Sequence, residues 1–438
     1  MKTGTFERGT HPPDSKEFTA SKPLVTAKVP KRVVIPLSQH IGAPCQSKVQ
    51  VGDAVKKGQV IGQADAFVSA PVHATVSGKV VAIMPYPHTL GRDVPSVVIE
   101  NDEKEEWVEG LQETPDYLSL DAEAMKAKVR EAGIVGMGGA TFPTHVKLSP
   151  PKEKKIECVI LNGAECEPYL TADHRMMLEE AEEVVAGLKV LMKIVGVERG
   201  YIGVEENKPD SIKSMEDACR NEPSIEVYSL KTKYPQGAEK MLIKAIVGRE
   251  VPAGGLPMDV GVVVQNIGTA VAIYEAVRFG RPLVERVVSV TGRGINEPRN
   301  LRVRIGTPIS SLIEECGGFK YESGKVISGG PMMGMAQSNL DAAVIKGTSG
   351  VLVLSPEESE TPPHGPCIRC SRCIDVCPMG LQPAMLSVLS EAGFYEEMKE
   401  YDLMNCFECG TCAYVCPSKR PIVQWVKLAK MNLAQQKK

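Results

Sequence analysis

The sequence predicts a multidomain protein that combines α/β and α+β folds. The chain has 438 residues, more than one core usually holds, since domains typically span roughly 100–200 residues. Short β-rich stretches give way to alternating strand and helix patterns from about residue 115. An acidic, proline-rich link then precedes a cysteine-rich C-terminal region. We therefore expect four folded modules joined in series.

Composition limits the classes of partner. With 43% apolar residues, 24% charged residues and a formal net charge of −3, the chain is typical of globular proteins and offers no electrostatic basis for binding nucleic acid. No apolar run approaches the roughly 20 residues that cross a bilayer. The N-terminus lacks the apolar core of a signal peptide. We expect a cytoplasmic chain without a transmembrane segment.

The first module is predicted to follow a leader, residues 1–32. Residues 33–105 contain short β-like stretches separated by Gly, Pro and Asp, as in a small all-β fold. The segment VGDAVKKGQVIGQADAFVSAPVHATVSGKV resembles the barrel-sandwich fold of biotinyl and lipoyl carrier domains. Those carriers present a modifiable lysine on a hairpin, whereas Ala64-Asp65-Ala66-Phe67 stands there in this chain. The resemblance therefore implies the fold without the carrier function.

Residues 115–285 are predicted to form an α/β domain around a parallel sheet. A helix from Leu120 to Ala132 precedes the strand CVILN, and a longer helix over 174–195 ends at Gly196, where a C-cap glycine is expected. The alternation continues to the apolar strand VGVVVQ. Ligands bind at the carboxyl ends of such strands, so the loops at that edge are the candidate site.

Two smaller regions complete the chain. Residues 286–355 are predicted to form a small α+β module with strands VVSVTG and LRVRIG, and residues 356–366 form a linker. Residues 367–438 are expected to fold as a separate helical domain. Its basic tail, KRPIVQWVKLAKMNLAQQKK, is expected to be a solvated terminal helix; an amphipathic helix against a partner or lipid is the alternative.

Two cysteine motifs share one spacing in this last domain. Each reads C-x2-C-x2-C-x3-C-P, the pattern of bacterial two-cluster ferredoxins, in which the fourth cysteine serves the other cluster. Zinc is disfavoured because four ligands per ion do not require the duplicated pattern. The remaining five cysteines are scattered: Cys45, Cys158, Cys219 and Cys316 are expected to be small buried residues, whereas Cys166 lies within the polar loop of residues 162–167. We predict two [4Fe–4S] clusters, held by Cys367, Cys370, Cys373 and Cys416, and by Cys406, Cys409, Cys412 and Cys377.

A glycine-rich loop is the main candidate for binding an organic cofactor. Residues 133–143 contain four glycines in seven residues, but they follow a predicted helix and have Thr141 where a dinucleotide fingerprint needs glycine. The loop is either a backbone cradle for phosphate or flavin, or a tight turn. Lys147 then adds a cation, and the strand CVIL delivers the polar loop from Asn162 to Glu167. The combination favours a cofactor site.

The motifs together resemble a known family. GMGGATFPTHVK followed by VILNGAECEP is similar to the flavin-binding, NADH-oxidising subunit of respiratory complex I. With HPPDSKEF, IPLSQHIGAPC, YPQGAEKMLIKAIVGREVP, ISGGPMMGM and the cysteine motifs, essentially the whole chain resembles the C subunit of the Rnf electron-transport complex. By that resemblance residues 286–355 are a β-grasp (SLBB-like) module, and the C-terminal domain is ferredoxin-like.

The resemblance implies cofactor contacts residue by residue. Two departures weaken the transfer of details, because Ala164 and Ala238 stand where the complex I subunit has acidic residues. Single residues also have plain structural alternatives: Lys147 as a solvated charge, Glu165 and Glu167 as helix caps, Asn162 in a turn. FMN and NADH contacts are expected from Gly136, Gly138, Gly139, Lys147, from Asn162, Glu165, Glu167, from Phe142 near the nicotinamide, from Gly237, Glu239, and from Gln265, Asn266, Thr269.

The implied activity is oxidation of NADH through non-covalent FMN, with single electrons passing to the two clusters. In that family the reaction is reversible with ferredoxin, reached through a partner subunit, and membrane subunits move Na⁺ or H⁺. The chain would lie peripherally on the cytoplasmic face of the membrane. The alternatives are a soluble flavin and iron–sulfur reductase similar to cobalamin reductase, and an electron-relay subunit that lacks flavin.

Overall fold

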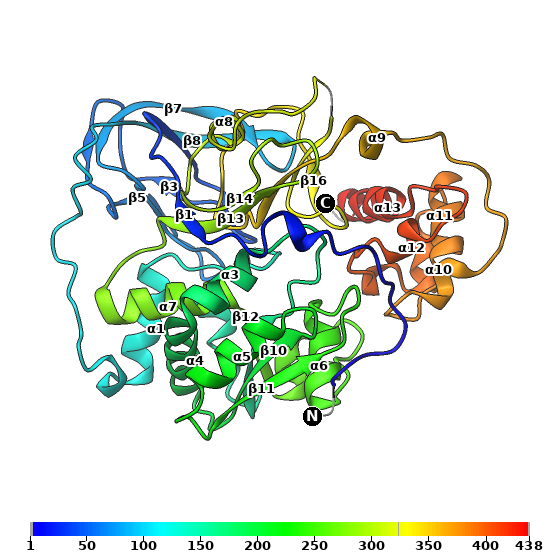
Figure 1. The fold of residues 1–438 in the computed structure, drawn as a ribbon, viewed down its shortest axis with the longest axis horizontal. Coiled ribbons are helices and arrows are strands. Elements are labelled where there is room, and N and C mark those ends of the chain that lie inside the picture. Colours follow the sequence, from blue (N-terminus) through cyan, green and yellow to red (C-terminus); the bar gives the residue numbers. More distant parts are fainter. Residues whose placement is uncertain (1–2, 323, 437–438) are drawn as a thin grey trace.

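The structure is a computed structural model that describes residues 3–322 and 324–436. Its sheets and helices form four modules (Figure 1). The N-terminal and third modules lie together on one side, the central α/β module lies opposite them, and the C-terminal module lies at one end. Among the described residues, no helix combines the length and apolar character that crossing a bilayer requires.

The N-terminal module contains two antiparallel sheets, ordered β2-β8-β7-β4 and β3-β5-β6. Both sheets contribute to one core, in which Ile35 and Val97 of the first meet Ile61 and Val72 of the second. This is the predicted barrel-sandwich arrangement. The strands are β2 Arg32–Pro36, β3 Gln46–Ser47, β4 Ala54–Val55, β5 Val60–Gln63, β6 Val72–His73, β7 Gly78–His88 and β8 Arg92–Asn101.

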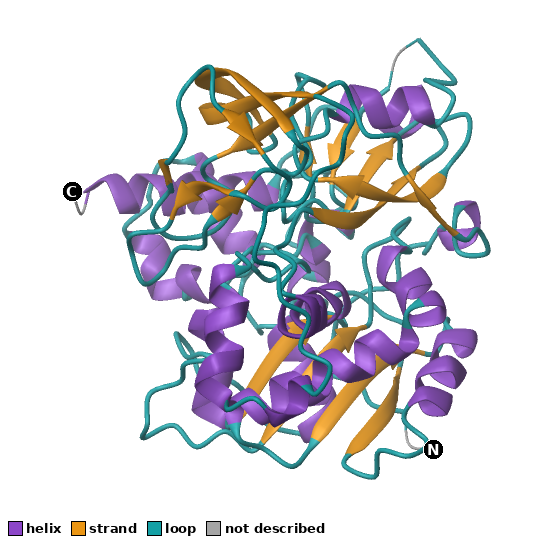
Figure 2. Ribbon diagram, turned by 90° about the vertical axis from the view of Figure 1, so that its left-hand side faces the viewer, coloured by secondary structure: helices purple, strands orange, loops and turns teal. Residues whose placement is uncertain are grey.

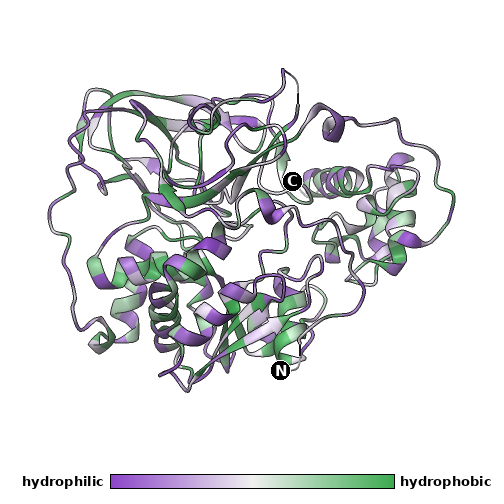
Figure 3. Cartoon of the chain, viewed as in Figure 1, coloured by the Kyte–Doolittle hydropathy of each residue, from purple (hydrophilic) through white to green (hydrophobic). Residues whose placement is uncertain are grey.

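The central module is built on a parallel four-stranded sheet, ordered β11-β10-β9-β12, as predicted. Alternate residues of β9 face opposite sides: Val159 and Leu161 join the core under α4 and α7, whereas Ile160 packs under α6. Figure 2 shows the helices around this sheet, and Figure 3 shows the hydrophobic character of its strands. The strands are β9 Cys158–Gly163, β10 Gly200–Glu205, β11 Ile225–Leu230 and β12 Val262–Asn266. The helices are η2 Tyr117–Ser119, α1 Ala122–Glu131, α2 Thr144–Lys147, α3 Ala172–Glu179, α4 Ala181–Val195, α5 Pro209–Ala218, α6 Glu239–Val247, η3 Pro257–Val260 and α7 Ile267–Phe279.

The prediction of one continuous helix over 174–195 was wrong, because the structure has two helices there, α3 and α4. Glu180 breaks it with φ −134° and ψ 35°, outside the helical region. The Glu180 side chain forms an ion pair with Arg302 of the third module, a partner that helical periodicity does not reveal. The C-cap prediction is confirmed, since Gly196 has φ 71° and ψ 41°.

The third module contains a mixed six-stranded sheet, ordered β1-β14-β13-β17-β15-β16, covered by α8. Its first strand comes from the N-terminal leader and pairs in parallel with β14, for example Leu24 with Asn300. The sheet therefore joins the start of the chain to residues almost 300 positions later. The elements are β1 Leu24–Thr26, β13 Glu285–Thr291, β14 Arg299–Arg304, α8 Ile309–Glu315, β15 Val326–Ser328, β16 Met335–Ala336 and β17 Gly350–Val353.

The part of the leader before β1 also joins the start of the chain to distant residues. We call residues 3–22 the N-terminal strap; it contains the short helix η1 Lys16–Phe18. Gly4 forms a bridge with Leu230 at the edge of the central sheet. The Gly9 amide donates to the carbonyl of Val376 in the C-terminal module, at 3.1 Å. Asn300 Nδ2 of the third module donates to the Thr19 carbonyl, so the strap contacts three modules (dark blue in Figure 1).

The C-terminal module is a small helical domain. Its terminal helix α13 packs on α11 through buried Val426, Ala429 and Leu433, so one face of the basic tail is part of this core. Lys437 and Lys438 of the tail lie outside the described residues. The helices are α9 Pro356–Ser359 in the predicted linker, then α10 Arg372–Asp375, α11 Pro383–Glu391, η4 Glu397–Tyr401, η5 Leu403–Asn405, α12 Thr411–Tyr414 and α13 Ile422–Gln436.

Candidate functional site

The carboxyl ends of β9 and β12 meet at one edge of the central sheet. The parallel register pairs Leu161 with Gln265 and Asn162 with Asn266. The next residues along the chain leave the sheet at this edge, which is where parallel sheets bind ligands. Two of the predicted polar segments are therefore neighbours, as expected.

The glycine loop is tied to the same edge. The Gly136 amide donates to the Phe142 carbonyl at 2.9 Å, which closes the loop on itself. The Met137 amide donates to Thr269 Oγ1 at 3.0 Å, and a Cβ built on Gly138 would lie 3.0 Å from Asn266 Cβ. Gly138 is therefore needed for the close approach of the loop to β12. Both Gly138 and Gly139 are exposed to solvent.

A cation and an acid from separate helices meet beside the loop. Lys147 Nζ donates to Glu239 Oε1 at 2.6 Å and to the Val264 carbonyl at 3.3 Å. Asn162 Nδ2 donates to the Gly237 carbonyl at 2.8 Å. Lys147 is about one-quarter exposed, so its charge borders both the protein and the open side of the site. Four of the predicted residues thus converge within one polar cluster.

Three buried side chains at this edge have polar atoms without a hydrogen-bond partner among the described residues. They are Gln236, through both amide atoms, Gln265 through Nε2, and Thr144 through Oγ1. Gln236 and Thr144 are fully buried and Gln265 is 2% exposed. Buried polar groups are normally bonded, and leaving one unbonded costs roughly 1–3 kcal/mol. The cluster fits a polar ligand that supplies the missing partners.

Glu165 forms the helix cap that was its structural alternative, and its contact with the cofactor stays a prediction. Its two carboxylate oxygens accept hydrogen bonds from the amides of Asp173 at 2.8 Å and His174 at 3.1 Å, so it caps the start of α3. Asp173 in turn accepts a hydrogen bond from Asn266 Nδ2 at 2.6 Å. Glu165 therefore reaches the site through Asp173 and Asn266, and the structure does not bring it to Lys147.

Glu167 lies against the third module. Its carboxylate accepts from the amides of Met332 at 3.0 Å and Met333 at 2.9 Å, within the glycine-rich loop ISGGPMMGM. Enclosure by this loop raises the pKa of Glu167 to about 7 despite the two donors. Its proposed role in the nicotinamide pocket stays a prediction, because in this structure its oxygens are occupied by backbone amides.

Two buried lysines support the loop of residues 164–170. The sequence did not single out either of them. Lys16 Nζ donates to three carbonyl oxygens of residues 165–170, at 2.6 to 3.1 Å. Lys208 Nζ donates to the Ala164 carbonyl at 2.7 Å and pairs with Glu205. Burial lowers the pKa of Lys16. The only signal was the motif HPPDSKEF, which contains Lys16.

The eight motif cysteines gather around two cavities. The structure divides them into the two crossed groups that the spacing predicts. No three His, Cys, Asp or Glu side chains in the described ranges converge on a single metal ion. Burial raises the pKa of Cys406 to about 11, so ligation must compensate for placing thiolates there. One cavity is lined by Cys367, Cys370, Cys373 and Cys416, and the other by Cys377, Cys406, Cys409 and Cys412.

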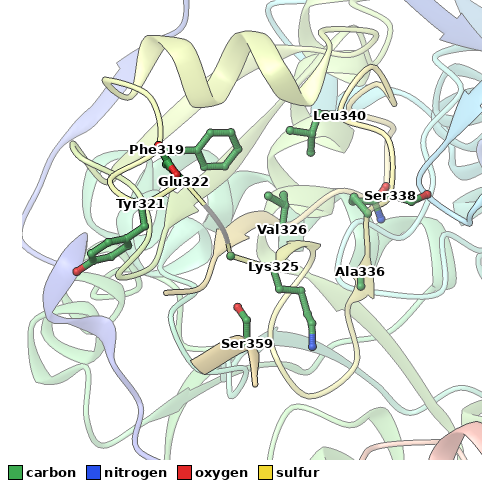
Figure 4. A pocket seen from close by; sticks show the side chains of 11 residues that line it. Phe319, Tyr321, Glu322, Lys325, Val326, Ala336, Ser338, Leu340 and Ser359 are labelled. Carbon is green, nitrogen blue, oxygen red and sulfur yellow. The ribbon is translucent and has the colours of Figure 1, made fainter. Parts of the chain in front are cut away.

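A separate cavity of about 730 Å³ lies on the third module. Phe319, Val326 and Leu340 are among the residues around it (Figure 4). None of the predicted site residues lines this cavity. This cavity therefore lies apart from the edge where the predicted residues converge.

Family comparisons match the four modules in order. Residues 4–104 match the RnfC barrel sandwich hybrid domain, and residues 129–275 match the Nuo51 FMN-binding domain. Residues 287–336 match the SLBB domain, and residues 366–419 match the 4Fe-4S dicluster domain. These matches confirm the predicted fold class and the predicted FMN and iron–sulfur cofactors.

The whole chain also matches curated relatives. It is 54% identical, over 97% of this chain and 93% of the relative, to the C subunit of the proton-translocating ferredoxin:NAD⁺ oxidoreductase complex of Clostridium ljungdahlii. The chain belongs to the family of Rnf complex C subunits. It is also 51% identical, over 100% of this chain and 99% of the relative, to the C subunit of the Na⁺-translocating ferredoxin:NAD⁺ oxidoreductase complex of Acetobacterium woodii.

One solved structure gives a weaker match. An NAD⁺-reducing [NiFe]-hydrogenase in the H₂-reduced state has a TM-score of 0.49 at 17% identity, covering 73% of this chain and 65% of the hydrogenase chain. A likeness at this level carries no functional inference.

Proposed function

We propose that this chain is the NADH-oxidising subunit of an Rnf-type ferredoxin:NAD⁺ oxidoreductase complex. The names of the relatives support that activity, and the match to an FMN-binding domain supports the cofactor. The observation that carries the proposal is the polar edge formed by the glycine loop, Lys147, Gln236 and Gln265, at the carboxyl ends of β9 and β12.

Each part of this edge has a task in holding FMN. The exposed loop at Gly138 and Gly139 brings backbone close to the ligand, and the Lys147 cation provides charge for a phosphate or a reduced ring. The unbonded amide of Gln265 supplies a donor for ring polar atoms. FMN supplies the chemistry that converts a hydride pair from NADH into single electrons. No protein acid or nucleophile is required for that conversion.

The arrangement of the cysteines supports an order for electron transfer. The Cys409 carbonyl accepts a hydrogen bond from Tyr234 of the central module, whereas Cys370 of the other group is exposed to solvent. We therefore propose that electrons enter at the cluster of Cys377, Cys406, Cys409 and Cys412. They would leave at the cluster of Cys367, Cys370, Cys373 and Cys416, toward a partner subunit that exchanges electrons with ferredoxin.

The coupling of this reaction to Na⁺ or H⁺ movement would belong to partner subunits. The names of the relatives describe one subunit of an ion-translocating complex, and no helix in the described ranges can cross a bilayer. We place this chain peripherally on the cytoplasmic face of the membrane, where NADH and ferredoxin are available.

Flavin retention tests the proposal. The anaerobically reconstituted protein should keep about one FMN per chain through gel filtration, and NADH should bleach the flavin absorbance. Lys154→Met, which changes a surface lysine paired with Asp259, is the matched control for variants at the site. A protein that binds both clusters but retains no flavin would be a relay subunit, and the proposal would be wrong.

A further inference from the structure

The C-terminal module contacts the rest of the molecule through few groups. None of its described helices α10 to α13 packs extensively against a helix or strand of another module. The linker before it is largely exposed from residue 360 to residue 364. Small interfaces between domains allow relative motion by default. Specific contacts must therefore hold the module if its clusters are to stay near the central module.

Among the residues that the structure describes, three hydrogen bonds join the C-terminal module to the strap and the central module, and all three end near the cysteines of one group. The Gly9 amide donates to the Val376 carbonyl at 3.1 Å, and Arg8 Nη1 donates to the Cys377 carbonyl at 3.4 Å. The Tyr234 hydroxyl donates to the Cys409 carbonyl at 2.8 Å. The strap and the central module thus both bind backbone carbonyls of the group that contains Cys377 and Cys409.

Tyr234 is the point at which these contacts join. It is 1% exposed, and its backbone exchanges two hydrogen bonds of 2.8 Å with Thr10 of the strap. Its hydroxyl also lies 3.5 Å from Glu167 Oε1, and Glu167 accepts from the Met332 amide. The Met332 carbonyl lies only 2.9 Å from a Cβ built on Gly410. Tyr234 therefore contacts the strap through its backbone, and it contacts the acidic loop and the C-terminal module through its hydroxyl.

We propose that Tyr234, together with strap residues Arg8 to Thr10, is a latch that docks the C-terminal module with its Cys406 and Cys409 side toward the flavin site. Tyr234 is then a positioning residue for electron transfer between flavin and the first cluster. This inference rests on the proposed function. It adds that docking depends on a hydroxyl that lies more than 170 positions along the chain from the cysteine whose carbonyl it binds.

The latch is tested with Tyr234→Phe in the full chain loaded with FMN and both clusters. Tyr228→Phe is the matched control, because no hydrogen bond from the Tyr228 hydroxyl occurs among the described residues and it lies on β11. Three quantities are measured: flavin reduction by NADH, the following reduction of the clusters, and hydrogen exchange at the Gly9 amide. Exchange at Gly9 reports docking directly, since this amide donates to Val376.

In Tyr234→Phe we expect flavin reduction to keep its rate while cluster reduction slows by up to about tenfold, the effect of one hydrogen bond on a docking equilibrium. Gly9 exchange should accelerate by a similar factor. Tyr228→Phe should match the wild type. Arg8 is exposed, and Arg8→Ala should accelerate Gly9 exchange less than Tyr234→Phe does. If Tyr234→Phe does not fold, Arg8→Ala replaces it in the test.

If Tyr234→Phe and Arg8→Ala both leave hydrogen exchange at Gly9 and the rate of cluster reduction unchanged, the proposed latch is wrong. The proposed function would not be affected by that result. Faster exchange at Gly9 without slower cluster reduction would also overturn the positioning role of Tyr234. The hydrogen bond to the Cys409 carbonyl would then serve only the stability of docking. Failure of NADH to reduce the flavin of the wild type would instead contradict the proposed function.

Discussion

Lys147 is positioned by two protein groups. Glu239 and the Val264 carbonyl fix its ammonium at the edge of the sheet, 2.6 Å and 3.3 Å away. Such preorganisation lowers the cost of binding an anion, because the side chain is already ordered. The partial exposure of Lys147 leaves room for a ligand on the open side.

Replacing Lys147 by methionine should weaken FMN binding by roughly 10- to 100-fold, the value of a hydrogen bond to a charged group. It also leaves Glu239 without its cation, which adds repulsion toward the phosphate. Titration of apoprotein with FMN, followed by flavin fluorescence, measures the effect. Equal affinities for Lys147→Met, Lys154→Met and the wild type would show that Lys147 does not contact FMN.

The raised pKa of Glu167 predicts that the stability of the folded protein depends on pH. Its folded pKa of about 7 exceeds its ordinary value of 4.5, so the folded protein binds the proton more tightly than the unfolded chain. This contribution is complete below pH 4.5 and is lost as pH rises through 7, an effect of about 2–3 kcal/mol. Urea unfolding at pH 5.5 and pH 8 should show a smaller difference for Glu167→Gln than for the wild type. An identical difference in both proteins would exclude this role.

The sequence predicted which residues gather, but not the direction of every side chain. Lys147, Asn162, Gly237 and Glu239 converge as the strand-end argument requires. Glu165 turns to α3 because its backbone adopts φ 43°, a local conformation that no periodicity indicates. Lys16 was missed because its partners are backbone carbonyls almost 150 residues away, and such acceptors leave no residue-type signal.

At the level of elements, α4 and α7 show how closely the helices of the central module pack. A Cβ built on Gly187 of α4 would lie 2.0 Å from the Ala270 carbonyl oxygen of α7. Gly187 therefore permits backbone contact between the helices under the sheet. The position also explains a glycine within a helix, where it is otherwise unfavourable.

Gly187→Ala should lower the free energy of unfolding by about 1–3 kcal/mol, although alanine is the better helix former. The added methyl group must push α4 and α7 apart. Chemical denaturation measures the change, with Glu182→Ala on the same helix expected to alter stability by less than about 0.5 kcal/mol. A stabilised Gly187→Ala protein would mean that helix propensity outweighs the packing.

The predicted cluster ligands cross between the segments around α10 and α12, because the cavity of Cys406 is also lined by Cys377. If Cys377 serves the cluster of Cys406, the double variant Cys377→Ser/Cys406→Ser damages one cluster and retains about four irons per chain in the other. Cys377→Ser/Cys370→Ser should damage both clusters. Iron analysis and EPR of the reconstituted variants distinguish the two patterns. The reverse result would assign Cys377 to the cluster of Cys370.

The prediction of secondary structure failed at the break between α3 and α4. Periodicity predicted the strands of the parallel sheet well, since each is a short apolar run between turn residues. It joined α3 and α4 because the apolar pattern continues across Glu180. At the break the Glu180 side chain pairs with Arg302, more than 120 residues away, and the sequence around Glu180 does not reveal this contact.

At the scale of the whole molecule, the order of the modules was predictable from composition and motifs, but the strap was not. Proline-containing leaders resemble linkers in composition, whereas residues 3–22 are ordered by backbone pairing with Leu230, Tyr234 and Val376. Backbone pairing is almost independent of residue type. The strap connects the central module, which carries the polar edge, to the cysteine group that contains Cys377.

The most direct test of this connection is an EPR spectrum of anaerobically purified protein, reconstituted with iron, sulfide and FMN, before and after addition of NADH. Signals of reduced [4Fe–4S] clusters should appear on NADH addition, because electrons are expected to pass from the polar edge of the sheet into the C-terminal module. Signals that appear only with dithionite would contradict NADH oxidation by this chain, while leaving two clusters in place.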